Sequence, residues 1–147
     1  MNASEILFRV TLAALSLVGL YTCFCFAKET LARFIKPLAD SKPLEAVCKD
    51  GSCLIIAHTR WAKLLGVPNW WFGTAFYLLT IIVAIYANVW FVTFAILGSL
   101  GAAVVSLILI YGLAFQLKSF CRICYLAHAV NFAILICWAI GFWRFTA

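Results

Sequence analysis

Four long apolar stretches constrain this chain more than any other feature of its sequence. Crossing the hydrocarbon core of a bilayer takes about 20 helical residues. The stretches run from about Ile6 to Ala27, Trp71 to Ala87, Trp90 to Phe115 and Ile123 to Trp143. Hydrophobic residues make up 67% of the 147 residues and charged residues 11%, which is too apolar for a water-soluble domain. The pattern predicts an all-α integral membrane protein, with four transmembrane helices bundled into one domain over residues 1–147.

The first stretch has two interpretations, because an apolar segment near a chain start also occurs in signal peptides. Residues 6–27 are long for the apolar region of a signal peptide, and Glu5 stands beside Arg9 at its start. We therefore predict a span that stays in the protein.

One sizeable polar segment, residues 28–70, separates the first two spans. It holds four of the five acidic residues and seven of the eleven cations: Lys28, Arg33, Lys36, Lys42, Lys49, Arg60 and Lys63. Within it, Ile55–Leu65 is predicted to form a short amphipathic helix that ends before Gly66 and Pro68 and lies across the mouth of the bundle. The cations behind the net charge of +6 are dispersed, so we expect contact with membrane lipid and no nucleic-acid partner.

Small residues recur along the third span. Gly98, Ala102 and Ser106 stand four residues apart, which places them on one helix face. Such a face lets helix backbones approach closely in lipid. The spacing predicts a compact bundle and indicates no particular function.

Two cysteine pairs lie far apart in the chain but on the same side of the predicted membrane. Cys48 and Cys53 fall in the polar segment, and Cys121 and Cys124 begin the fourth span. Because successive spans alternate in direction, the polar segment and the start of the fourth span face the same side. The topology therefore predicts that all four cysteines converge on one membrane face.

The two pairs differ in their setting. Cys121-Arg122-Ile123-Cys124 is a C-x-x-C motif at a helix N-terminus, where backbone amides and the helix dipole stabilise a thiolate. At 1.5 Å per residue, Cys124 lies about 4–5 Å deeper than Cys121, which suits it to a substrate dissolved in the bilayer. The loop pair flanks a turn at Asp50 and Gly51. A loop pair and a membrane pair together indicate a relay by thiol–disulfide exchange.

Other interpretations of the cysteines stay open. Four cysteines form zinc sites in many proteins. The residues around neither pair resemble those of a zinc knuckle, so we predict no metal. Inert structural disulfides and cysteines that only pack are further alternatives, as is a DsbB-like oxidase, which would carry its pairs in the reverse order. Cys23, Cys25 and Cys137 lie within apolar spans, and the first two point to different helix faces. We predict that these three only pack.

Two further polar residues are candidate ligand contacts. His128 shares a helical face with Cys121 and Cys124, and its ring suits either a hydrogen bond to a quinone carbonyl or a bond between helices. Asn69 precedes the second span, where an asparagine either caps the helix or donates to the same carbonyl. The sequence does not decide between these roles.

The combined motifs resemble those of the vitamin K epoxide reductase family. The resemblance covers nearly the whole chain. It is carried by Cys53, Thr59-Arg60-Trp61, Asn69-Trp70-Trp71-Phe72-Gly73 and Cys121-Arg122-Ile123-Cys124, in this order and spacing. A C-x-x-C motif alone is weak evidence, but this combination is specific.

The resemblance implies a fold and a site. A four-helix bundle would enclose a quinone of the ubiquinone, menaquinone or phylloquinone type, beneath a short horizontal helix. Cys48 would exchange disulfides with a thioredoxin-like (DsbA-like) protein, and Cys53 would connect Cys48 to Cys121. At the quinone, Cys124 would make contact, Asn69 would donate a hydrogen bond and Thr59 would occupy the family's hydroxyl position.

The chain departs from parts of the family pattern. Four residues separate the loop cysteines, as in bacterial members, and His128 replaces the tyrosine of animal members, so epoxide reduction is not implied. We expect no fused thioredoxin-like domain of the kind some bacterial members carry, and therefore predict a separate partner protein.

Membrane orientation receives conflicting signals. Disulfide formation suits the bacterial periplasm, which predicts an inner-membrane protein with its cysteine face outside. The positive-inside rule favours the opposite orientation, because most cations lie in the polar segment. We favour the periplasmic orientation, with the inverted one as the alternative.

Overall fold

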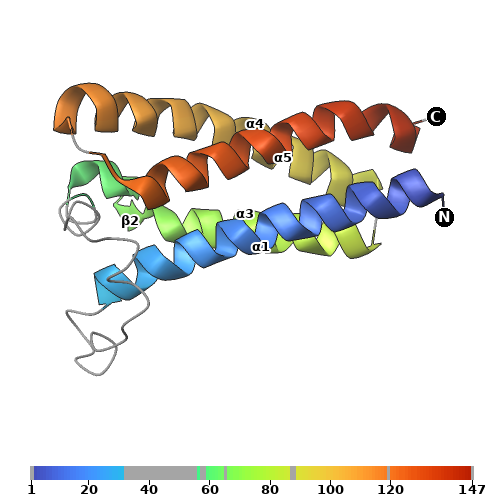
Figure 1. Cartoon of the computed structure of the whole chain (residues 1–147), viewed down its shortest axis with the longest axis horizontal. Helices are drawn as coiled ribbons and strands as arrows, with labels where there is room; N and C mark the ends of the chain where they lie inside the picture. The colour runs from blue at the N-terminus through green and yellow to red at the C-terminus, as the bar shows by residue number, and fades with distance from the viewer. Residues whose placement is uncertain are drawn as a thin grey trace.

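The computed structural model describes residues 2–31, 56, 59–64, 66–86, 89–118 and 120–146. Four long helices dominate this part of the chain (Figure 1). They are α1 (Ala3–Leu31), α3 (Asn69–Tyr86), α4 (Val89–Tyr111) and α5 (Arg122–Thr146). All four are long and apolar enough to cross a membrane, so the predicted all-α four-span architecture is confirmed. The helix ends differ from the predicted ones by a few residues, most at α1, which continues through Lys28 to Leu31.

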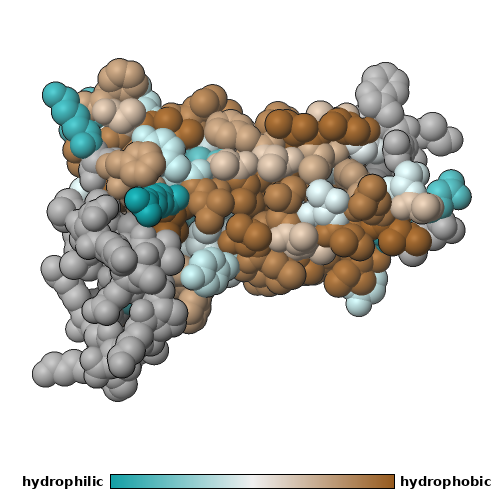
Figure 2. Space-filling model, viewed as in Figure 1, coloured by the Kyte–Doolittle hydropathy of each residue, from teal (hydrophilic) through white to brown (hydrophobic). Residues whose placement is uncertain are grey.

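The helical form follows from the solvent. A bilayer core offers no water to bond exposed amide and carbonyl groups, and a helix satisfies these groups within its own segment. Leu17, Phe94 and Ile136 are each about 60% exposed, as lipid-facing side chains are. Figure 2 shows hydrophobic residues over the middle of the bundle, while the strongly hydrophilic ones in this view lie toward its two ends.

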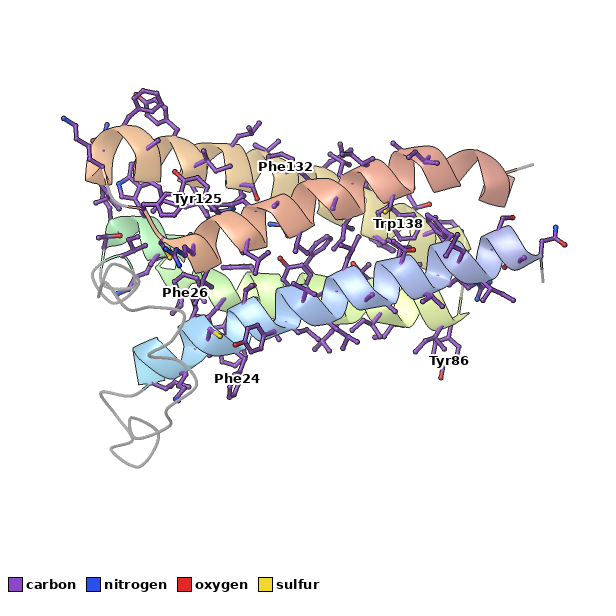
Figure 3. The ribbon with its side chains drawn as sticks, in the orientation of Figure 1. Phe24, Phe26, Tyr86, Tyr125, Phe132 and Trp138 are labelled. Atoms are coloured by element: carbon purple, nitrogen blue, oxygen red, sulfur yellow. The ribbon has the colours of Figure 1, made fainter. Side chains whose placement is uncertain are left out.

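The helices form a closed ring. α1 packs against α3 and α5, and α4 packs against the same two helices from the other side. Both chain ends lie at one end of the bundle, opposite the end where α5 begins (Figure 1). The core near the chain ends includes Leu12 and Ile134, together with Trp138, which meets Phe8 edge-on at 5.6 Å between ring centroids. Figure 3 shows Trp138 directed into the bundle, whereas Tyr86 points out of it.

A charged side chain ties α1 to α3 near the chain ends. Arg9 pairs with Glu5 at 2.6 Å and donates to the carbonyl oxygens of Ile85 at 3.1 Å and Ala84 at 3.4 Å. The last carbonyls of a helix have no partner within the helix, and the guanidinium supplies one here.

The polar segment differs from its prediction. Within the predicted helix Ile55–Leu65, Ile56 is α-helical and a 3-10 helix, η2, covers Arg60–Ala62. The next residues instead form an antiparallel pair of short strands, β1 (Lys63–Leu64) and β2 (Val67–Pro68). The helix prediction is therefore wrong at residues 63 and 64. The physical reason is the reversal at Gly66, whose φ of 83° turns the chain so that Leu64 pairs with Val67. Residues 55, 57, 58 and 65 lie outside the described part.

The third span is longer than predicted. α4 continues as a π-helix, η3 (Gly112–Leu117), and ends at Lys118, which adopts a left-handed conformation with φ 46° and donates its amide to the Leu113 carbonyl. A π-helical turn shifts the side chains that follow it around the helix axis. Here it lies at the same end of the bundle as the C-x-x-C motif.

Candidate functional site

A cavity of about 440 Å³ opens inside the bundle, within the range of small-molecule sites. Its wall is mostly apolar and comes from all four helices and from the segment around η2. Among the lining residues are three of the predicted site residues: Asn69, Cys124 and His128. The structure therefore brings together side chains that are up to 59 positions apart in the chain.

One face of α5 supplies the chemistry of the cavity wall. Cys124, Ala127, His128 and Asn131 all line it. They stand at positions i, i+3, i+4 and i+7, which is the spacing of a single helical face. The predicted shared face of Cys124 and His128 is confirmed, and the face extends to an asparagine.

Cys121 immediately precedes α5 and acts as its N-terminal cap. Its Sγ accepts a hydrogen bond from the Cys124 amide at 3.3 Å, and its carbonyl accepts one from the Tyr125 amide at 3.1 Å. Amide donors of this kind, together with the helix dipole, stabilise a thiolate. Lys118 and Arg122, close to Cys121 in the chain, are exposed cations. The predicted location of the C-x-x-C motif at a helix start is confirmed.

The two cysteines of the motif have different surroundings. Cys124 lines the cavity, whereas Cys121 is fully buried and is not among the lining residues. Both pack with Cys25 and Ile56 in a small apolar cluster at the loop end of the bundle. Figure 3 shows Phe26, which packs on this cluster, near the start of α5. Cys124 is thus the sulfur of the motif that meets the cavity.

Three buried polar atoms of cavity-lining residues have no hydrogen-bond partner among the described residues. They are Oδ1 of Asn69, Nε1 of Trp70 and Nδ1 of His128. Buried polar groups in native proteins are nearly always bonded, so such atoms call for an explanation. They come from two helices, α3 and α5, and border the same cavity, which indicates a ligand that offers hydrogen-bonding atoms.

Asn69 opens α3 but does not cap it through its side-chain oxygen, since that oxygen has no partner in the described chain. Its amide nitrogen instead donates to the Trp61 carbonyl at 2.9 Å. Capping of the helix by Oδ1 is therefore wrong. The bond to Trp61 holds the amide group at the cavity wall with its oxygen available.

Trp61 of the Thr59-Arg60-Trp61 motif lines one side of the cavity. The Trp61 ring lies against Gly112, where any Cβ would come within 2.7 Å of the ring carbons, and Arg60 stands over the same ring at 5.5 Å. Thr59 is not a lining residue; its hydroxyl donates to the Ile56 carbonyl at 2.8 Å. The hydroxyl expected near the site therefore holds the turn that carries Ile56 onto the cysteine cluster.

The remaining predicted residues divide into two groups. Cys48 and Cys53 lie outside the described residues. Cys23 and Cys25 are buried and Cys137 is half-buried, as expected for cysteines that pack, although Cys23 also lines the cavity. Among the described residues, no three side chains of metal-binding type come together.

Sequence reasoning missed a polar group deeper in the cavity, made of Tyr77, Ser106 and Asn131. Asn131 stands three residues after His128, a spacing that would have placed it on the same face. Ser106 belongs to the small-residue stripe with Gly98 and Ala102, and all three line the cavity. The stripe therefore makes room for the cavity as well as for close helix packing.

These features define a class: an integral membrane protein whose four-helix bundle encloses an apolar cavity with a helix-capping C-x-x-C motif at one end. Comparison with protein families then identifies it. The model of the vitamin K epoxide reductase family matches residues 10–139, and the chain belongs to this family. It is accordingly a multi-pass membrane oxidoreductase of the class that acts on quinones and disulfides.

Proposed function

We propose that this protein transfers electrons from a thioredoxin-like (DsbA-like) protein to a quinone in the bilayer. Membership in an oxidoreductase family supports the general reaction. The observation that supports electron transfer to a quinone is the position of Cys124, which lines an apolar cavity together with Asn69 and His128. The other cysteine of the motif, Cys121, caps the start of α5.

The relay begins with the partner protein. A thiolate of the reduced partner attacks Cys48 of a Cys48–Cys53 disulfide, and the partner's second thiol then displaces Cys48. The partner leaves as a disulfide, and the loop pair has gained two electrons and two protons. The loop placement of this pair between two spans suits it to meet a protein outside the membrane.

The second exchange moves these electrons into the bundle. Cys53 attacks Cys121 of a Cys121–Cys124 disulfide, and Cys124 departs as the thiolate. Cys48 then attacks Cys53, which releases Cys121 and re-forms the loop disulfide. Amide donation to Sγ of Cys121 supports this role, because it stabilises the thiolate that is released.

Quinone is the final acceptor. The reduced pair gives two electrons and two protons to the quinone, Cys121 and Cys124 form their disulfide again, and quinol leaves into the lipid. The unpaired indole N–H of Trp70 supports a substrate with a carbonyl group, and the unpaired Oδ1 of Asn69 can accept from a hydroxyl of the quinol product. The net reaction oxidises one partner dithiol and reduces one quinone.

A turnover assay tests this proposal. The purified full chain is mixed with a reduced DsbA-like protein and ubiquinone-1 or menadione, and quinol formation is followed by absorbance. Cys124→Ala should abolish turnover, whereas Cys137→Ala, on the same helix but outside the cavity wall, should leave it unchanged. Equal rates for Cys124→Ala and the unmodified protein would refute the relay. Stoichiometric zinc in the purified protein, with no quinol formed, would favour the alternative of a four-cysteine metal site.

We further propose that the cysteine face is periplasmic in a bacterial inner membrane. The chemistry of disulfide formation supports this orientation, against the charge distribution. A variant that retains Cys48 as its single cysteine is treated with a membrane-impermeant maleimide in intact cells. Labelling before lysis is expected, and labelling only after lysis would establish the inverted orientation.

A further inference from the structure

Three polar side chains from three helices join inside the cavity. The Tyr77 hydroxyl of α3 donates to Oδ1 of Asn131 on α5 at 2.7 Å, and Nδ2 of Asn131 donates to Oγ of Ser106 on α4 at 2.9 Å. All three residues line the cavity. They lie deeper than the C-x-x-C motif, because Asn131 is seven residues, or about 10 Å, further along α5 than Cys124.

The arrangement leaves donors rather than acceptors for a ligand. An asparagine amide has two N–H donors, and a serine hydroxyl has one O–H donor. One N–H of Asn131 is used by Ser106, and Oδ1 is used by Tyr77. The second N–H of Asn131 and the hydroxyl hydrogen of Ser106 make no bond to the described residues. A carbonyl oxygen is the group that accepts from both.

The packing holds this amide in place. Tyr77 and Ser106 are buried to 2% and 1% exposure, whereas Asn131 between them is half-buried. The Tyr77 ring rests directly on Gly19 of α1, where any Cβ would overlap the ring. Because the ring packs against Gly19, the Tyr77 hydroxyl is held at Oδ1 of Asn131, and the amide nitrogen of Asn131 faces away from Tyr77. Hydrogen bonds between polar side chains also join helices to one another. That role alone does not require the three side chains to line a cavity.

The cavity therefore has two polar ends at different depths along α5. The first end contains Cys124 and His128 of α5 with Asn69 of α3, and the second contains Asn131 of α5, three residues beyond His128. The cavity wall as a whole is mostly apolar, which suits the ring of a quinone. The two carbonyl groups of a para-quinone stand on opposite sides of one ring, which matches a site with a polar group at each end.

We infer that Asn131, positioned by Tyr77 and Ser106, donates a hydrogen bond to the quinone carbonyl that lies farther from Cys124. This inference rests on the proposed function, since it assigns a second contact to the same substrate. It makes Asn131 a residue that selects ring compounds with two opposed carbonyls over those with one.

The test compares a ligand that has two opposed carbonyls with a related ligand that has one. Menadione has two, and 2-methyl-1-tetralone, which is also saturated at C2–C3, has one. Affinities are measured by calorimetry on the purified chain carrying Cys124→Ala, which prevents turnover. This protein should bind menadione more tightly, and adding Asn131→Leu should reduce the preference about tenfold, the size of one hydrogen bond. Tyr77→Phe, which keeps the ring on Gly19, should reduce it in part.

A matched pair on α4 controls for damage to the fold. Ser106→Ala removes a hydroxyl of the polar chain, whereas Ser99→Ala removes an equally buried hydroxyl that bonds the Ala95 carbonyl and does not line the cavity. The preference for menadione should fall only in Ser106→Ala. A general loss of stability lowers both affinities and leaves their ratio unchanged. An unchanged ratio in Asn131→Leu therefore overturns the inference.

Failure of the inference and failure of the proposed function give different results. With dithiothreitol as electron donor, the otherwise unmodified protein should reduce ubiquinone-1, and Asn131→Leu should lower kcat/KM about tenfold. If the unmodified protein forms no quinol, the proposed function fails. If it forms quinol and Asn131→Leu does so with the same kcat/KM, only the second contact is wrong.

Discussion

The contact of Trp61 with Gly112 allows a quantitative test of how the cavity wall is built. In Gly112→Ala, the new Cβ would lie 2.7 Å from Cδ2 and Cε3 of the Trp61 ring. Carbon atoms in contact stand about 3.5–4.0 Å apart, so the ring must retreat by roughly 0.8 Å. Overpacking of this kind costs about 1–3 kcal/mol, whereas alanine gains about 1 kcal/mol over glycine in a helix. The net expectation is a lower free energy of unfolding by about 0–2 kcal/mol.

The steric part of this effect can be isolated because it requires the indole ring. In a Trp61→Ala background the clash is absent, and Gly112→Ala should stabilise the protein by up to about 1 kcal/mol. The coupling free energy between the two substitutions is then about 1–3 kcal/mol. Gly101→Ala serves as a control on the same helix, since a Cβ there meets nothing within 4 Å and should not destabilise.

The assay is unfolding in mixed detergent micelles with increasing dodecyl sulfate, followed by far-ultraviolet circular dichroism on the two single variants, the double variant and the unmodified chain. The KM for ubiquinone-1 should also rise in Gly112→Ala, because the Trp61 carbonyl holds the amide of Asn69 at the cavity. A coupling below about 0.5 kcal/mol would refute the contact, since substitutions at independent sites add within that margin.

Three further substitutions test other contacts. Arg9→Met removes the donor to two carbonyls at the end of α3 and should lower the free energy of unfolding by about 1–3 kcal/mol in the same titration. The KM for ubiquinone-1 should not change. An unchanged free energy of unfolding would contradict the role of Arg9. Thr59→Val should cost about 1 kcal/mol through the lost bond to the Ile56 carbonyl, and Thr59→Ser should restore it. Asn69→Leu should lower kcat/KM for ubiquinone-1 about tenfold in the dithiothreitol assay, and an unchanged value would remove Asn69 from the site.

The motif at Cys121 was readable from the sequence because its chemistry is local. The start of a helix, the three-residue spacing to Cys124 and the shared face with His128 all follow from helix geometry within one segment. The structure confirms each of these features. The roles of the same residues in electron transfer stay predictions.

The segment before the second span was less predictable. Its apolar residues fit a helix, but the pairing of Leu64 with Val67 across Gly66 forms a hairpin instead. Short apolar runs do not distinguish helix from strand by periodicity. The role of Asn69 was likewise left open, because the bond to Trp61 depends on how this hairpin returns the chain to α3.

By itself the sequence determined the membrane location, the four spans, the family pattern and the position of the C-x-x-C motif at a helix start. These properties arise from the transfer of apolar segments into lipid and from contacts between residues close in the chain. Only the tertiary structure decided which polar atoms border a common cavity. The hydrogen bonds from Tyr77 to Asn131 and from Asn131 to Ser106 span 54 and 25 residues. The packing of the Tyr77 ring on Gly19 adds a contact with α1. Such contacts depend on the relative rotation and depth of whole helices, which packing sets and local sequence does not encode.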